Sequence, residues 1–312
     1  MPYNTATGVS TSNILQTVFY TLLALMAFAA NSVLCRLALE MRVDGAAIDA
    51  GSFTVVRLVS GISALLLILW VRSLMEKTTG KALSENAVKS NGSWFAAIML
   101  FLYAAGFSYA YISLETGTGA LILFGVVQMT MIAMSIYNGN KLHYTEWTGV
   151  ALAFIGFVYL ILPGVSAPSM QGLILMTIAG VAWGYYTLAG KKTQDPLRDT
   201  SFNFLRTIPF IIALAFYNYD GYYFSVKGLM LAAASGALTS GVGYTIWYIA
   251  LRSLKTMQAA VLQLLVPVIA ALGGILFVDE PLTNRLFVSA ILILGGILLV
   301  VVGKKILVSK RP

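Results

Sequence analysis

The sequence predicts an all-α integral membrane protein in which ten transmembrane helices form two inverted five-helix repeats around a central cavity. Of its 312 residues, 59% are hydrophobic and only 10% are charged, whereas a soluble domain carries about 25% charged residues. The mean hydropathy is +0.84. Apolar runs of about 20 residues, long enough to cross a hydrocarbon core as a helix, recur along the chain. An internal duplication supports the arrangement in two halves.

The expected helices follow from these apolar runs. In chain order they lie at residues 14–36, 50–71, 94–113, 119–137, 145–163, 171–189, 202–217, 228–249, 256–277 and 286–303. The runs are too long for barrel strands, and a helix satisfies every backbone amide inside the bilayer. The first run is longer than the core of a signal peptide, so we interpret it as a retained helix. The connections are short, and no soluble domain is expected.

The duplication is clearest near the C-terminus. Residues 256–282 repeat residues 116–142 without a gap, at a spacing of 140 positions (256 − 116). Other spacings align the earlier helices, so we expect one repeat over residues 1–167 and a second over 168–312. Because five is an odd number, the second repeat must enter the membrane from the opposite face. Inverted repeats of this kind are typical of carriers, which expose one central site to either side in turn.

Charge predicts the orientation. Fourteen of the twenty Lys and Arg residues fall on the side that holds the N-terminus, four fall on the other side, and Arg57 and Arg206 fall within spans. Basic loops stay in the cytoplasm, so both termini are expected there. The net charge of +8 is therefore attributed to topology. Nucleic-acid binding is not expected, because no basic face lies outside the membrane.

Several motifs occur in the same order in both halves. The first is Trp183-Gly184-Tyr185-Tyr186 followed by Lys191, which aligns with Phe28-Ala29-Ala30-Asn31 followed by Arg36. The second is an arginine within a span, Arg57 in the first half and Arg206 in the second. The third is Pro267 followed by Asp279-Glu280-Pro281. In these motifs, over essentially the whole chain, the sequence resembles the drug/metabolite transporter superfamily. Within it the chain is similar to the ten-helix EamA exporters, most of all to the YddG type of bacterial aromatic amino-acid exporter. The first half departs from the pattern, because Val127 replaces the proline and Asn140 the acid.

The resemblance implies a function and a location. It implies a multi-pass protein of the bacterial inner membrane that exports amino acids, preferably aromatic ones, by alternating access. The partners would be the small-molecule substrate and the lipid bilayer. An exporter of another small metabolite or drug is the alternative within the superfamily.

Polar and aromatic side chains in mid-span are expected to face the interior or a water-filled cavity. Helical spacing groups them into stripes on the first, third, fourth, sixth, eighth and ninth helices. The predicted cavity residues are Asn31, Tyr103, Phe107, Gln128, Trp183, Tyr186, Tyr244, Trp247 and Gln263. Helix packing is the alternative for any one of them. Together they predict an apolar and aromatic wall with a few polar groups, which suits a small amphipathic or aromatic solute.

Two further groups have structural roles in this interpretation. Pro267, Gly273 and Gly274 are expected to form a hinge, since proline removes a backbone hydrogen bond and glycine lowers helix stiffness. Arg57 and Arg206 are expected to bind helix-end carbonyls, in preference to a substrate carboxylate.

Other functions are less well supported. An enzyme would need a nucleophile with its base or a metal cluster, and one Cys and one His offer little for either; no cofactor, metal or catalytic residue is expected. A channel would need a selectivity filter or a charged ring, and none is visible. No Asp or Glu falls deep within a span, which favours facilitated efflux or exchange over proton antiport, although Glu115 or Asp199 could take part. The sequence leaves the physiological solute, the resting conformation and the oligomeric state open.

Overall fold

The computed structural model describes residues 11–40, 47–78, 91–139, 143–162, 167–191, 193–217, 221–254 and 262–308. Within those ranges every regular element is a helix, and the only extended pairing is one isolated bridge between Ile48 and Phe224. In chain order the helices are α1 (Thr11–Leu39), α2 (Ala50–Thr78), α3 (Trp94–Ala110), α4 (Thr116–Tyr137), α5 (Tyr144–Ile161), α6 (Met170–Gly190), α7 (Pro196–Leu205), α8 (Ile208–Tyr217), α9 (Val226–Ala234), the π-helix η2 (Ser235–Val242), α10 (Gly243–Ser253), α12 (Leu265–Val278) and α13 (Asn284–Val308). The predicted all-helical class is confirmed.

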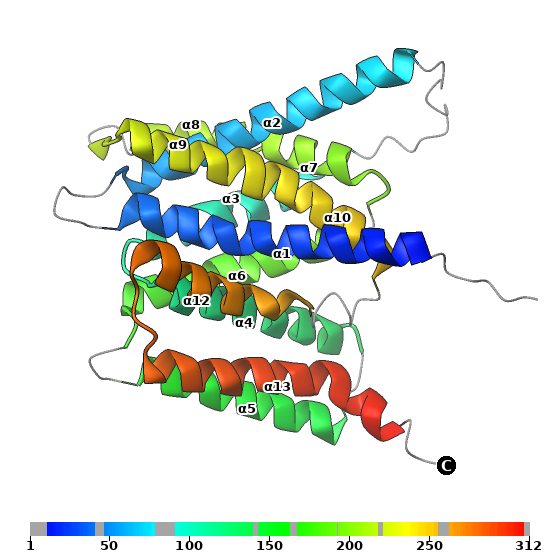
Figure 1. Ribbon diagram of the computed structural model, residues 1–312, viewed down its shortest axis with the longest axis vertical. Coiled ribbons are helices and arrows are strands. Elements are labelled where there is room, and N and C mark those ends of the chain that lie inside the picture. Colours follow the sequence, from blue (N-terminus) through cyan, green and yellow to red (C-terminus); the bar gives the residue numbers. More distant parts are fainter. Residues whose placement is uncertain are drawn as a thin grey trace, which may run out of the picture.

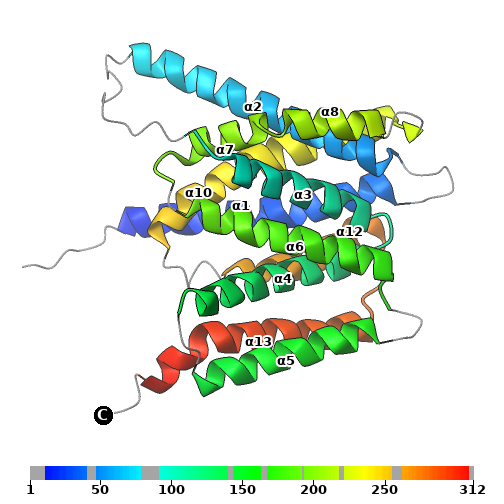
Figure 2. The same ribbon diagram turned by 180° about the vertical axis from the view of Figure 1, so that it is seen from behind.

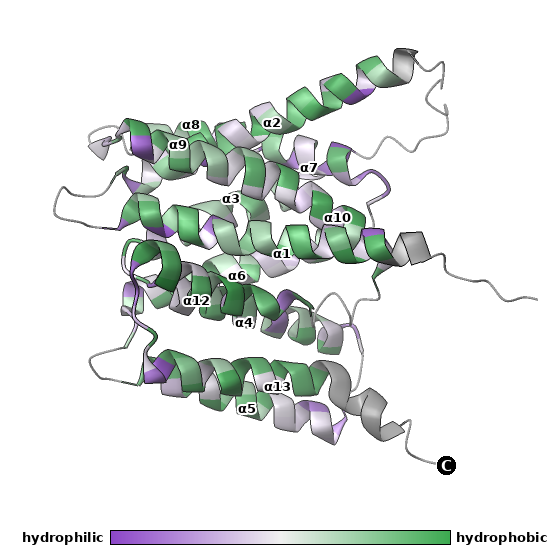
Figure 3. Ribbon diagram, in the orientation of Figure 1, coloured by the Kyte–Doolittle hydropathy of each residue, from purple (hydrophilic) through white to green (hydrophobic). Residues whose placement is uncertain are grey.

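The helices have the length and composition of membrane spans. In the described part of the chain, seven are long and apolar enough to cross a bilayer, and Trp94–Ala110, Leu265–Val278 and Asn284–Val300 are shorter apolar helices. Colouring by hydropathy shows apolar residues along the lateral surface and polar ones gathered toward the helix ends (Figure 3). Large side chains such as Leu276 and Phe216 are more than two-thirds exposed on that surface, as expected of residues that face lipid.

The helices form layers. In Figures 1 and 2, α5 and α13 pack side by side at one edge, α2 and α8 lie at the opposite edge, and α1, α3, α6 and α10 lie between. The start of α1 and the end of α13 lie at the same end of the molecule (Figure 1). That end also carries Arg72 in the last two turns of α2, Lys191 directly after α6, and Arg252 in the last turn of α10. We refer to it as the basic end.

Local sequence explains several helix starts. Ser93, Ser169 and Ser225 each precede a helix and accept a hydrogen bond from the backbone N–H three residues on, which satisfies one of the free donors at a helix N-terminus. Asp195 does the same for α7, and Pro196 follows it at the first helical position, where a missing N–H costs nothing.

Two of the expected helices are interrupted. The one predicted at 202–217 is split into α7 and α8 at Arg206 and Thr207, because Pro209 has no N–H for the Leu205 carbonyl four residues earlier. The one predicted at 228–249 contains the π-helix η2 at its centre. Single π turns within α-helices are frequent at functional sites. Ser235, Thr239 and Ser240 of η2 are buried in the interior, whereas Leu238 is exposed.

Candidate functional site

The interior of the central helices holds all of the side chains that were predicted to line a cavity. All nine are buried, and none is more than 4% exposed: Asn31, Tyr103, Phe107, Gln128, Trp183, Tyr186, Tyr244, Trp247 and Gln263. They come from α1, α3, α4, α6, α10 and the residues before α12. They form an aromatic cluster and a polar cluster that share two tyrosines, and a cavity adjoins them.

Arg57 is the centre of the polar cluster. Its side chain extends from α2 and is 1% exposed. Nε donates to Ser240 Oγ at 3.1 Å, and Nη2 donates to the hydroxyls of Tyr103 at 3.1 Å and Tyr244 at 3.0 Å. The guanidinium also lies 4.9 Å from the ring centroid of Phe107, within the range of a cation–π contact. Every partner of Arg57 in the described structure is thus uncharged.

The π-helix supplies the rest of the polar cluster. Asn31 Oδ1 accepts from Ser235 Oγ at 2.6 Å and from Thr239 Oγ1 at 3.1 Å, and its Nδ2 donates to Tyr103 Oη at 3.2 Å. A Cβ on Gly236 would collide with the carbonyl oxygen of Arg57. Glycine at this position therefore permits the close contact between η2 and α2 that brings the Ser240 hydroxyl within reach of Arg57.

The aromatic cluster consists of Phe28, Tyr103, Trp183, Tyr186 and Tyr244. The ring of Trp183 lies 4.7 Å from Tyr103, 4.7 Å from Tyr244, 5.3 Å from Tyr186 and 5.9 Å from Phe28, measured between centroids. These distances and tilted geometries are those of favourable aromatic pairs. These rings surround Trp183, and it is not among the described residues that line the cavity next to the cluster.

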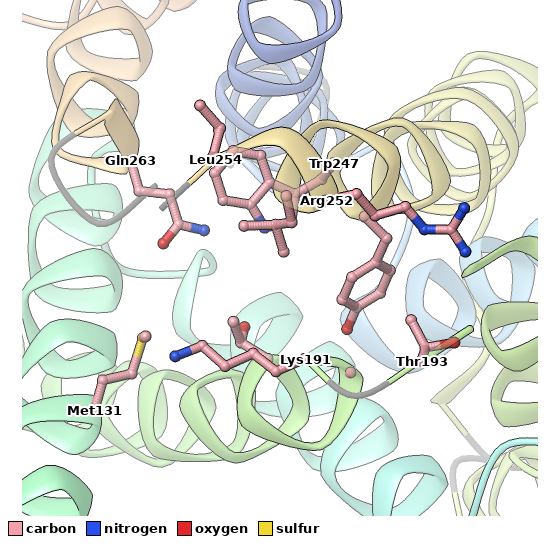
Figure 4. A pocket seen from close by; sticks show the side chains of 11 residues that line it. Met131, Lys191, Thr193, Trp247, Arg252, Leu254 and Gln263 are labelled. Atoms are coloured by element: carbon pink, nitrogen blue, oxygen red, sulfur yellow. The ribbon is translucent and has the colours of Figure 1, made fainter. Parts of the chain in front are cut away.

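A cavity of about 180 Å³ lies between the aromatic cluster and the basic end. Figure 4 shows Trp247 and Gln263 on one side of it and Lys191 on the other. Trp247 joins the cavity to the aromatic cluster, since its ring lies 5.7 Å from that of Phe28. Of the predicted residues, only Trp247 and Gln263 line this cavity; the other seven lie deeper.

Several buried donors of these clusters have no acceptor. Within the described residues, four buried side-chain nitrogen atoms lack a hydrogen-bond partner: Arg57 Nη1, Trp183 Nε1, Trp247 Nε1 and Gln263 Nε2. All four belong to residues of the clusters or of the cavity. A buried donor left unpaired costs free energy, about 1–3 kcal/mol in proteins, so each such group calls for an explanation.

The two in-span arginines differ. Arg206 is half-buried and donates to the backbone carbonyls of Asn91 and Phe202, as expected. Arg57 contacts side-chain hydroxyls and no helix-end carbonyl. In the described structure the partners of Arg57 are therefore not the helix-end carbonyls that were expected, because the hydroxyls of Tyr103 on α3, Ser240 on η2 and Tyr244 on α10 surround its guanidinium.

The hinge predicted at Pro267, Gly273 and Gly274 stays a prediction, and the structure shows how these residues pack in one conformation. Helix α12 begins at Leu265, so Pro267 lies in its first turn, where the absent N–H breaks no bond within α12. Residues 255–261, at the start of the predicted helix, lie outside the described residues. Gly273 and Gly274 are buried, and Cβ atoms there would collide with Val33 and with Glu280 and Thr116. Close packing accounts for both glycines.

At the end opposite the basic end, Glu280 joins three elements. Its carboxylate accepts from the backbone N–H of Thr116 at 2.8 and 3.0 Å and pairs with Arg36 Nε at 3.0 Å. Arg36 Nη1 donates in turn to the carbonyl oxygen of Tyr111 at 3.1 Å. A carboxylate is favourable at the N-terminus of α4 because of the helix dipole. We call Arg36, Thr116 and Glu280 the Glu280 cluster.

Two ionisable groups near the ends are perturbed. Partial burial lowers the pKa of the Lys191 ammonium at the cavity. Partial burial, followed by the negative charge of Glu280, raises the pKa of the Glu115 carboxyl at the start of α4. Within the described residues no group of three His, Cys, Asp or Glu side chains is placed to hold a metal ion.

Sequence reasoning did not identify the π-helix, Ser235, Thr239 or the Glu280 cluster. A row of small hydroxyl residues on one span, Ser235, Thr239 and Ser240, was the available signal. Glu280 was noticed only as part of a motif, because its partners are 164 and 244 residues away.

The chain is similar in sequence to transporters of one family. Residues 170–302 match the EamA-like transporter family. An uncharacterised protein of Pseudomonas aeruginosa is 44% identical over 290 residues, which cover 91% of this chain and 94% of that protein. Two relatives from Escherichia coli are 27% identical: a probable amino-acid metabolite efflux pump, with 61% of this chain and 69% of that protein covered, and the threonine/homoserine exporter RhtA, with 58% and 60% covered.

A solved crystal structure shares the fold, with a TM-score of 0.62 at 13% identity over 95% of this chain and 99% of that one. The apolar helices, the buried polar interior and these relatives lead to one conclusion: the chain belongs to the EamA-like transporter family and is a multi-pass membrane protein.

Proposed function

We propose that the protein is a carrier that exports amino acids from the cytoplasm, with a preference for aromatic side chains and broad tolerance for others. The observation that carries the proposal is the aromatic cluster around Trp183, which adjoins a cavity at the basic end. Aromatic pairs contribute about 0.5–1.5 kcal/mol beyond burial, so a substrate ring that takes its place among these rings gains affinity. The names of the two Escherichia coli relatives support an amino-acid substrate.

The proposal includes an inverted repeat over residues 1–167 and 168–312, with ten membrane-spanning helices. Reciprocal packing supports it: α1 packs against η2, α10 and α12, and its proposed counterpart α6 packs against α3 and α4, the counterparts of those elements. Helices α5 and α13 pack against each other, as expected of a pair related by the repeat.

The proposed transport cycle depends on the cavity at the basic end of the molecule and on the Glu280 cluster at the opposite end. The cavity reaches the surface at the basic end, which positive charge assigns to the cytoplasm, through exposed Lys191 and Arg252. At the other end the Glu280 cluster joins α1, α4 and the segment after α12. A substrate would enter past Trp247 and Gln263, displace the rings around Trp183 and leave when the Glu280 cluster separates. This is alternating access at one central site.

Purified protein in liposomes tests the proposal. We expect efflux of phenylalanine and tryptophan in preference to threonine, measured with and without a pH gradient to separate facilitated export from proton coupling. Trp183→Ala should reduce phenylalanine transport about 2- to 10-fold more than threonine transport, which is the stacking energy expressed as a rate ratio. Trp183→Phe should restore much of the ratio.

Trp147→Ala is the matched control, because Trp147 is 57% exposed at a helix end and should leave the phenylalanine-to-threonine ratio unchanged. The ratio does not depend on how much protein is inserted. Equal loss for both amino acids in Trp183→Ala would show that Trp183 only packs the interior. Transport of cationic drugs or other metabolites, with no amino-acid transport, would favour the alternative substrate class.

A further inference from the structure

We propose that Arg57 binds the carboxylate of the transported solute, so that the site selects for a carboxylate and makes little demand on the ammonium group. The inference rests on the proposed function and names the substrate group that the central site recognises. It differs from the sequence expectation, which gave Arg57 a structural role.

The first observation is an unbalanced charge. Arginine remains protonated in proteins, and an ionised group taken out of water is costly unless it is paired. Arg57 is 1% exposed in the middle of the helix bundle. The ion pairs of the described residues are Arg36 with Glu40 and Glu280, and Arg72 with Asp195. None of them involves Arg57, so a carboxylate that enters the site would be its only anionic partner there.

The second observation concerns which nitrogen atoms of the guanidinium already have hydrogen-bond acceptors. Three hydroxyls, those of Tyr103, Ser240 and Tyr244, accept from Nε and Nη2. Nη1 has no acceptor. The hydroxyls therefore fix the plane of the guanidinium and leave one terminal nitrogen for a further acceptor. A carboxylate is the acceptor that arginine binds best, through charge-assisted hydrogen bonds.

The third observation is the excess of donors. Besides Arg57 Nη1, the unpaired buried nitrogens in the described part of the chain are those of Trp183, Trp247 and Gln263, and each can only donate. The unpaired hydroxyls of Tyr186 and Thr187 beside them can donate as well as accept. Donors without acceptors are thus present at the cavity, in Trp247 and Gln263, and deeper in the clusters, in Trp183 and Arg57. A solute rich in acceptors, such as a carboxylate, would satisfy them. A cationic amine would add more donors and repel Arg57.

The site offers only weak hydrogen-bond acceptors to the ammonium group of a substrate. Among the described residues, no Asp or Glu lines the cavity or takes part in the hydrogen bonds of the polar cluster. The available acceptors are neutral oxygens such as that of Gln263, which already accepts from Gln128 at 3.4 Å. Removal of the ammonium from a substrate should therefore cost far less than removal of the carboxylate.

The experiment compares three ligands that carry the same phenyl ring. Purified protein is titrated with phenylalanine, 3-phenylpropionate, which lacks the ammonium, and phenethylamine, which lacks the carboxylate. Binding is followed by tryptophan fluorescence and by the midpoint of thermal unfolding, and the same compounds compete against labelled phenylalanine in liposome counterflow. We expect 3-phenylpropionate to bind within about 10-fold of phenylalanine. Phenethylamine should bind about 10- to 100-fold more weakly, the loss expected for a charged hydrogen bond.

Variants identify the residue. Arg57→Gln should remove the advantage of 3-phenylpropionate over phenethylamine, and Arg57→Lys should retain part of it, since lysine keeps the charge without the planar fork. Arg206→Gln is the matched control, an in-span arginine that binds backbone carbonyls, and should keep the wild-type selectivity. Unfolding midpoints show whether each variant is folded; if the Arg57 variants are not, the wild-type ligand series decides alone.

The outcomes separate the two proposals. Equal binding of 3-phenylpropionate and phenethylamine to the wild-type protein, or unchanged selectivity in a folded Arg57→Gln, would overturn the role of Arg57 even if phenylalanine is exported. Arg57-dependent binding of 3-phenylpropionate without any phenylalanine counterflow would overturn amino-acid export and support the role of Arg57. Absence of binding by all three compounds would overturn both.

Discussion

Replacement of Glu280 by glutamine should favour a conformation that is open at the end opposite the cavity. In the structure the two oxygens of the Glu280 carboxylate share the backbone N–H of Thr116 in one bifurcated hydrogen bond, and Oε1 also accepts from Arg36. The side chains of Arg36 and Glu280 are only 14% and 8% exposed. Since these bonds join α1, α4 and the segment after α12, they must break before the helices can separate there.

The size of the effect follows from the bonds that change. A hydrogen bond to a charged group contributes about 1.5–3 kcal/mol to stability, and a carboxylate at a helix N-terminus adds a few tenths to 1 kcal/mol. Glutamine has the same shape and keeps one acceptor oxygen, so we expect a net loss of about 2 kcal/mol. This corresponds to an increase of about 30-fold in the ratio of open to closed molecules.

Cys35 provides the assay. It is the single cysteine of the chain, is fully buried and lies next to Arg36. A membrane-impermeant thiol reagent applied to intact cells should label Cys35 up to about 30-fold faster in Glu280→Gln. Asp279→Asn is the matched control, because Asp279 is exposed and adopts a left-handed backbone conformation that asparagine also tolerates. If both variants label at the wild-type rate, the Glu280 cluster does not hold this end closed.

Three further predictions follow from the same end of the molecule and from the charge pattern. Gly274→Ala should lower the unfolding midpoint and speed labelling of Cys35, because its methyl group would collide with the Glu280 carboxylate; unchanged values would show that the backbone yields. Glu115→Gln should raise the unfolding midpoint at pH 7.5, because the raised pKa of Glu115 means that its charged form is less stable in the folded protein than in the unfolded chain. This gain in stability should vanish as the pH falls through the raised pKa to about 4, where the carboxyl is protonated in both states. In intact cells, a cysteine at Asn284 should react with an impermeant reagent and one at Ser90 should not, and the reverse pattern would overturn the proposed orientation.

The sequence alone determined the class of protein and the burial of the nine polar and aromatic residues predicted to face the interior. Membrane spans depend on local composition, because the bilayer imposes a fixed length of apolar helix, so the expected starts of α2 and α3 coincide with the observed ones. The burial of Asn31, Trp183 and Tyr244 was likewise predictable. A polar or aromatic residue in mid-span avoids lipid by facing other helices, and helical spacing shows which residues share that face.

Only the tertiary structure decided which of these groups meet. The proposed duplication aligns Arg57 with Arg206, yet Arg57 meets the hydroxyls of α3, η2 and α10 while Arg206 reaches carbonyl oxygens. Glu280 stabilises the start of a helix that lies 164 residues earlier in the chain. Helical periodicity fixes the direction of a side chain on its own helix. The identity of its partner depends on how distant helices cross and on irregular turns such as η2, and local sequence patterns do not specify either.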